Sequence, residues 1–137
     1  MSLGFKYAAL SNIGKIRQSN QDSGYAGPNL LVLADGMGGP AGGDIASSIA
    51  IDHLRGLDCP ADNPEQALDS LRDAINEAHQ ELCERSTQDP ALAGLGTTCI
   101  AIRRSENDLT MTHIGDSRAY RLRGGELRQM TNDHSFV

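Results

Sequence analysis

The sequence predicts an α+β fold in which helices pack on a mostly antiparallel sheet. Strand-type segments come first, two helical segments follow, and a run of β-branched strands ends the chain. Helices and strands that are segregated along a chain are typical of this fold class. The chain has 137 residues, of which 39% are hydrophobic, and this is the size of one domain with a modest core. We therefore predict a single domain over residues 1–137.

The first part of the chain predicts short strands. Residues 5–10 alternate weakly between apolar and polar side chains and predict a strand, and residues 11–22 form a polar connection. A short strand is expected at 23–26. Residues 30–34 are five apolar residues bounded by turn signals on both sides, which predicts a buried strand. A loop with many glycines, residues 35–44, follows it.

Two helices come next. Apolar residues recur at helical spacing from Ile45 to Leu54, and Gly56 can end that helix. Asn63 and Pro64 open a second helix with the residues preferred at a helix start, and Gln66 stands where a capping box places it. One apolar stripe then runs along this helix: Leu68, Leu71, Ile75, Ala78 and Leu82.

The remaining elements are strands. Segments 97–102, 109–114 and 117–122 are separated by short polar turns, and Gly124-Gly125 predicts a hairpin turn into a last strand at 126–130.

Composition excludes several classes of protein. The net charge of −6 argues against a nucleic-acid binder, and six arginines between Arg103 and Arg128 are expected mostly on a solvated face. No apolar run is long enough to span a membrane. The three cysteines lack zinc-ligand spacing and indicate reduced thiols in a cytoplasmic protein, with Cys99 packed in the core.

Three aspartates stand at element boundaries: Asp22, Asp35 and Asp116. Carboxylates that gather there require a cation, since nearby anions repel one another. Oxygen ligands suit Mg²⁺ or Mn²⁺, and Gly36 could offer its carbonyl oxygen. Arg17 is suited to holding a phosphate group. The alternatives are that each aspartate caps a turn and that Arg17 is a surface residue.

The glycine-rich loop does not fit the common nucleotide or calcium motifs. No Lys follows its glycines, so it is not a P-loop. It lacks the alternating acidic residues and closing Glu of an EF-hand, and no βαβ unit accompanies it, as a dinucleotide fingerprint requires.

Five motifs occur in an order that resembles one family: RQSNQD, LADGMGG followed by GGDIAS, GTT, IGDSRAY and TNDHS. This order is similar to that of bacterial metal-dependent serine/threonine protein phosphatases, the PPM or type 2C group. The resemblance implies an αββα sandwich of antiparallel sheets flanked by helices, with two Mg²⁺ or Mn²⁺ ions. It also implies that a metal-activated water attacks phosphorus in line in phosphoserine or phosphothreonine of proteins.

The resemblance assigns roles to individual residues. Asp35 bridges both metals, Gly36 offers its carbonyl to one, Asp22 acts on the metals directly or through water, and Asp116 helps to bind a third, looser ion. Arg17 holds the phosphate, and Asn20, Thr97 and Thr98 support the site. Asp133 and His134 precede a mobile flap. The substrates implied are phosphoproteins, the products of a serine/threonine kinase.

The sequence departs from the family pattern in two ways, and these departures suggest an alternative to a working phosphatase. Met37 and Pro40 stand where relatives commonly carry a histidine, so the proton donor is unassigned. The remaining histidines are His53, His79, His113 and His134; the first three are expected to be structural, and a metal-bound water is the alternative donor. Family catalytic domains also continue for roughly another hundred residues. We therefore expect the N-terminal half of a catalytic domain. The alternative is a non-catalytic fragment or interaction module that self-associates through an uncovered sheet.

Overall fold

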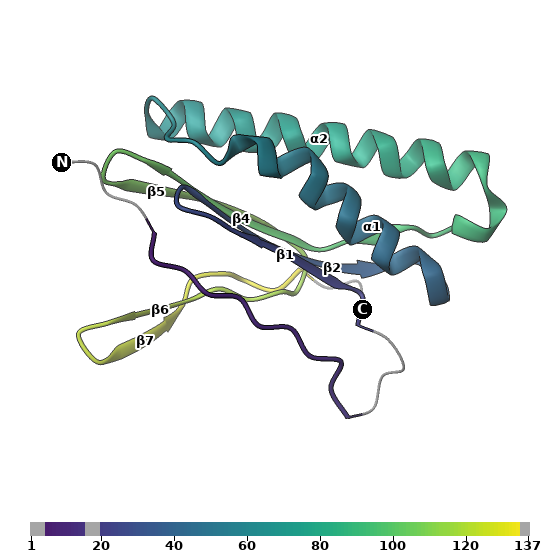
Figure 1. Ribbon diagram of the computed structural model, residues 1–137, viewed down its shortest axis with the longest axis horizontal. Coiled ribbons are helices and arrows are strands. Elements are labelled where there is room, and N and C mark those ends of the chain that lie inside the picture. The colour runs from purple at the N-terminus through teal and green to yellow at the C-terminus, as the bar shows by residue number, and fades with distance from the viewer. Residues whose placement is uncertain (1–4, 16–19, 135–137) are drawn as a thin grey trace.

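The computed structural model in Figure 1 describes residues 5–15 and 20–134. Its main sheet is antiparallel, with the strand order β1-β2-β4-β5. These strands are β1 (Asp22–Ala26), β2 (Leu30–Met37), β4 (Cys99–Ser105) and β5 (Asp108–Ile114). A two-residue strand, β3 (Gly96–Thr97), extends the sheet at the end of β2. A separate hairpin consists of β6 (Tyr120–Arg123) and β7 (Glu126–Gln129). The predicted α+β class is confirmed.

Both long helices lie on one face of the sheet, while the β6–β7 hairpin and the N-terminal segment lie on the other (Figure 1). The helices are α1 (Gly39–Leu54) and α2 (Pro64–Gln88), with short 3₁₀ turns η1 (Arg55–Leu57) and η2 (Pro90–Leu92) after them. The start predicted for α2 is confirmed, because the Asn63 side chain accepts a hydrogen bond of 2.8 Å from the amide of Gln66. A cap of this kind contributes about 1 kcal/mol to helix stability.

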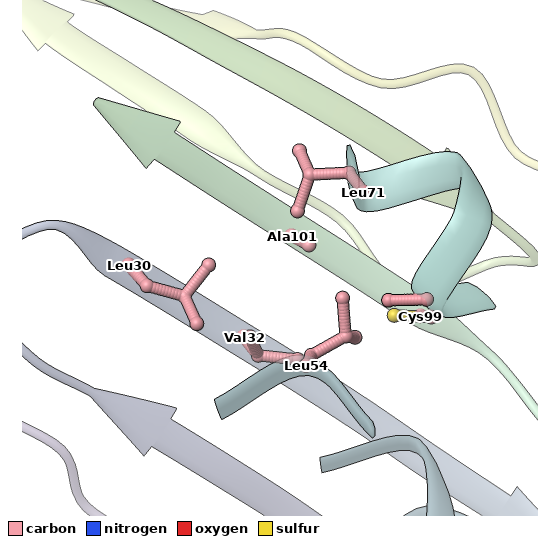
Figure 2. Close-up of a cluster of buried hydrophobic side chains, with 7 residues drawn as sticks. Leu30, Val32, Leu54, Leu71, Cys99 and Ala101 are labelled. Atoms are coloured by element: carbon pink, nitrogen blue, oxygen red, sulfur yellow. The ribbon is translucent and has the colours of Figure 1, made fainter. Parts of the chain in front are cut away.

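The hydrophobic core lies between the helices and the sheet (Figure 2). Along β2, alternate residues from Leu30 to Gly36 are buried against the helices, and the residues between them face the other side. Leu54 of α1 and Leu71 of α2 contact this strand face together with Cys99, Ala101 and Val32. Cys99 is buried in this core, which confirms its predicted packing role, and this burial raises the pKa of its thiol to about 11.

Three predicted boundaries are wrong. Residues 5–10 form no strand, because their alternation is weak; their backbone is attached instead through the Phe5 amide, which donates to the Pro28 carbonyl at 2.9 Å. Helix α1 begins at Gly39, inside the predicted loop, because Gly38 with φ of 139° makes the turn within one residue. The strand predicted at 117–122 begins only at Tyr120, since the turn after β5 includes Gly115 with φ of 100°.

The prediction of solvated arginines is wrong for Arg103 and Arg104, which are only 3% and 6% exposed. The Arg104 guanidinium donates twice to Asn29 Oδ1, at 3.0 and 2.8 Å, and Arg103 donates to the Cys59 carbonyl at 3.3 Å. Buried charged groups require such partners. Arg118, Arg123 and Arg128 are exposed, as expected.

The sheet face opposite the helices is covered only in part, since Leu33 on it is exposed whereas Ile100 is buried. A groove of about 740 Å³ runs between this face and residues 8–12, and Asp22 and Arg118 are among the residues that line it. Leu33 on this face is 41% exposed. Over the described residues, no helix is both long and apolar enough to cross a membrane.

Candidate metal centre

Asp22 and Asp35 lie directly opposite one another, at the first residue of β1 and near the end of β2. The Gly36 amide donates to the Gln21 carbonyl at 3.1 Å, one position further along the two strands. That bond makes 22 and 35 a non-hydrogen-bonded pair, the type in which opposing side chains come closest. Both residues belong to the alternation that points away from the helices.

Two like charges directly opposite each other on a sheet destabilise the strand pair. Asp22 is exposed and Asp35 is half-buried. A divalent cation removes this repulsion, and carboxylate oxygens are the donors that Mg²⁺ and Mn²⁺ prefer. The residues present at this strand end therefore fit a hard divalent ion.

Thr98 holds the backbone of Asp35 in place. Its hydroxyl accepts a hydrogen bond from the Asp35 amide at 3.0 Å, and its own amide donates to the Asp35 carbonyl at 2.9 Å. The same hydroxyl lies 2.7 Å from the hydroxyl of Ser117. Because Thr98 is only 6% exposed, these bonds are shielded from water, and they connect the end of β2 to the turn that carries Asp116.

Gly36 lies where helix α1 packs closely on strand β2. A Cβ at this position would collide with the backbone carbonyl of Gly43 in the first turns of α1. The glycine-rich sequence therefore has a structural reason here: it lets the strand end and the helix start touch backbone to backbone.

Asp116 is exposed in the turn after β5. Within the described ranges, no three His, Cys, Asp or Glu side chains gather into a cluster that could hold a metal. The structure thus places Asp22 and Asp35 together and does not gather Asp116 with them into such a cluster.

The IGDSRAY and TNDHS motifs are joined in space. The Gly115 amide donates to His134 Nδ1 at 3.3 Å, and the His134 amide donates to the Gly115 carbonyl at 2.9 Å. Arg118 donates to both carboxylate oxygens of Asp133, at 3.1 and 2.7 Å. The hydrogen bond from Arg118 holds the pKa of Asp133 below its usual value of 3.8. The sequence singled out both motifs but did not reveal that this ion pair joins them.

The other predicted site residues have the following positions. Asn20 accepts from the Asp22 amide at 3.0 Å and donates to the Ser11 hydroxyl at 2.6 Å, so it fixes the start of β1. Thr97 pairs with Gly36, and its hydroxyl donates to the Thr98 carbonyl at 2.7 Å. Arg17 lies outside the described residues.

The sequence does not single out Ser117 as a site residue. It also does not decide which histidine, if any, is a proton donor. Ser117 touches Thr98 across 19 positions of sequence, and only its place inside the IGDSRAY motif could have indicated it. His53 lies between the two helices, 3.8 Å from Glu77 and 3.6 Å from Glu81. The rings of His113 and His134 have centroids 4.8 Å apart, beside the Gly115 turn.

Comparison with known proteins decides the family. The family model described as protein phosphatase 2C matches residues 15–136. The chain belongs to this family.

Individual members of the phosphatase 2C family resemble the chain closely. The serine/threonine protein phosphatase PstP of Mycobacterium tuberculosis is 45% identical over 138 aligned residues, which cover 100% of this chain and 26% of PstP. The crystal structure of the PstP catalytic domain in complex with two manganese ions superposes with a TM-score of 0.91 at 44% identity, covering 98% of this chain and 58% of that one.

A third relative is PppA, described as a key regulatory component of the type VI secretion system in Pseudomonas aeruginosa. It superposes with a TM-score of 0.84 at 33% identity, over 94% of this chain and 56% of PppA. The chain thus spans about a quarter of full-length PstP and somewhat more than half of the solved relatives.

Proposed function

We propose that residues 1–137 belong to the catalytic domain of a bacterial serine/threonine protein phosphatase, of which this chain forms the N-terminal part. The reaction is metal-dependent hydrolysis of phosphoserine and phosphothreonine in proteins. The observation that carries the proposal is the opposed pair of Asp22 and Asp35, with the Asp35 backbone held by Thr98. A full αββα sandwich is part of the proposal, and the face of the main sheet opposite the helices is where a second sheet would pack.

The proposed cofactors are two Mn²⁺ or Mg²⁺ ions, with a third bound more loosely. The relative solved with two manganese ions supports this number. Asp22, Asp35 and the Gly36 carbonyl would hold the two main ions, and Asp116 would serve the third. When bound, such ions supply Lewis-acid activation of water for in-line attack on phosphorus and neutralise charge on the phosphoryl group.

The chain's own residues position this chemistry. Arg17 is proposed to grip the phosphate through two parallel hydrogen bonds, as a guanidinium can. Asn20 fixes the backbone of Asp22, and Thr98 fixes that of Asp35. Thr97 lies beside Gly36 and supports the strand end. Because Asn20, Thr97 and Thr98 lie on the strands or at their ends, they hold the backbones of Asp22 and Asp35 in place before substrate binds.

The proposed partners are phosphorylated proteins, the substrates of a serine/threonine kinase. Neither a nucleic acid nor a membrane is proposed as a partner of this chain, given its net charge of −6. We propose a cytoplasmic location. Three free cysteines support it, because cytoplasmic proteins keep thiols reduced.

A second candidate is a non-catalytic module. The described residues contain no cluster of three potential metal ligands, and Leu33 on the sheet face opposite the helices is 41% exposed. The first observation favours a chain that does not hydrolyse phosphoproteins by itself. The second favours self-association through this sheet face.

The test is Mn²⁺-dependent hydrolysis of a phosphothreonine peptide by the 137-residue chain. We expect Asp35→Ala to lower the rate by roughly a hundredfold or more, because losing a direct metal ligand costs at least as much as losing a residue behind one. Asp73→Ala, an exposed aspartate on α2, is the matched control and should keep the full rate.

No turnover by the unaltered chain, together with a dimer by light scattering, would favour the second candidate. Equal rates for Asp35→Ala and the unaltered chain would contradict the proposed function.

A further inference from the structure

His79 and Cys83 form a side-chain pair on the exposed surface of helix α2. They are four residues apart, and His79 Nε2 lies 3.6 Å from Cys83 Sγ. Side chains at this spacing are neighbours on one face of a helix. Both residues are exposed, and within the described ranges neither side chain has another hydrogen-bond partner. Both donor atoms are therefore available to a ligand from solvent.

We propose that His79 and Cys83 bind a divalent metal ion of the zinc type, such as Zn²⁺ or Co²⁺. This site is separate from the oxygen ligands of Asp22 and Asp35, and it does not depend on the proposed phosphatase activity.

The distance between the two donor atoms fits such an ion. Zinc binds thiolate sulfur at about 2.3 Å and imidazole nitrogen at about 2.0–2.1 Å, so a tetrahedral angle places the two ligand atoms about 3.6 Å apart. The observed separation is 3.6 Å. No rearrangement of the helix is needed, and Ala78 and Leu82, one position before each ligand, are buried and hold this part of α2 against the rest of the protein.

The ligand chemistry selects a different ion from the one expected at the aspartates. Sulfur and imidazole nitrogen favour Zn²⁺, Co²⁺ or similar ions, whereas carboxylates favour Mg²⁺ and Mn²⁺. On binding, the Cys83 thiol loses its proton to solvent, and the thiolate binds the metal. His79 binds as the neutral ring, through the Nε2 lone pair, with its proton on Nδ1. Water completes the coordination.

The other cysteines do not offer this chemistry. Cys99 is buried, and its raised pKa opposes thiolate formation. Cys59 is exposed, but its sulfur accepts a hydrogen bond of 3.3 Å from the cationic guanidinium of Arg103, which repels a metal ion. Cys59 is therefore a matched control: an exposed thiol in the same chain without an imidazole beside it.

The experiment is a Co²⁺ titration of the intact chain in excess Mg²⁺, which occupies oxygen sites. Binding at the pair should give the thiolate-to-cobalt charge-transfer band in the near ultraviolet. We expect Cys83→Ser to abolish the band and His79→Gln to weaken apparent affinity by roughly tenfold or more, because one of two protein ligands is gone. Cys59→Ser and Asp35→Ala should keep the band. Zn²⁺ should displace Co²⁺ and bleach it.

Absence of the band in the unaltered chain, or its persistence in Cys83→Ser, would overturn the proposal. So would its loss in Cys59→Ser. Far-ultraviolet circular dichroism of each variant confirms that α2 is intact, which is expected because both ligands are on the surface. Retention of the band in Asp35→Ala, in a protein without phosphatase turnover, would support this site independently of the proposed function.

Discussion

At the scale of single residues, the Thr98 hydroxyl links the backbone of the candidate metal ligand Asp35 to the turn after β5. It bonds the Asp35 amide on one side and the Ser117 hydroxyl on the other, in a position that is only 6% exposed. A buried polar group that loses its partner keeps the full cost of its desolvation. The hydroxyl therefore matters for stability as well as for the site.

We expect Thr98→Val to lower the free energy of unfolding by about 1–3 kcal/mol. Valine has nearly the same volume as threonine, but it removes the hydroxyl that bonds the Asp35 amide and the Ser117 hydroxyl. Thr98→Ser restores the hydroxyl and should recover most of this loss. Urea unfolding of the three proteins measures the difference. Equal midpoints for Thr98→Val and the unaltered chain would show that the hydroxyl does not hold Asp35.

At the scale of elements, the contact that places the site is the one between the end of β2 and the start of α1. Gly36 and Gly43 touch there backbone to backbone, so a side chain at Gly36 has no space to occupy. The obstacle is a backbone carbonyl rather than a flexible side chain, so the helix as a whole must move.

Gly36→Ala should therefore destabilise the protein by about 1–3 kcal/mol, the usual cost of overpacking a well-packed contact. Gly56→Ala is the matched control, because a Cβ at Gly56 meets no atom within 4 Å; its effect should stay within about 0.5 kcal/mol. Thermal unfolding of both variants tests this. A Gly36→Ala protein as stable as the control would mean that α1 is not packed on the strand end.

These elements differ in how well the sequence predicts them. The strand from Leu30 and the helix start at Asn63 were predictable because their signals are local: an apolar run between turns, and a capping residue before proline. The register that places Asp22 directly opposite Asp35 could not be predicted in this way, because register depends on pairing between strands that are separate in the sequence. No local pattern indicates a role for Asp58, yet its carboxylate accepts a hydrogen bond from the Tyr25 hydroxyl at 2.6 Å, across 33 positions of sequence.

At the scale of the whole molecule, the described residues form a main sheet covered by helices and a separate β6–β7 hairpin. Helices cover one face of the main sheet, whereas the β6–β7 hairpin is a separate two-stranded sheet and all residues of β7 are exposed. An isolated hairpin is marginally stable in water. The segments that flank the hairpin are joined by two interactions: the His134 amide donates a hydrogen bond to the Gly115 carbonyl just after β5, and Arg118 forms an ion pair with Asp133.

Amide hydrogen exchange should therefore be at least roughly a hundredfold faster in β7 than in β4, because exposed hairpins open locally while core strands exchange only on larger unfolding. Asp133→Asn should further speed exchange at the His134 amide and leave β4 unchanged. The pKa of Asp133 is lowered in the folded protein, so the ion pair contributes above the ordinary value of 3.8 and is lost as pH falls through the lower folded value. The difference between Asp133→Asn and the unaltered chain should accordingly vanish at acid pH. Exchange in β7 as slow as in β4 would contradict the expected local opening of the hairpin. A difference between Asp133→Asn and the unaltered chain that persisted at acid pH would show that it does not come from this ion pair.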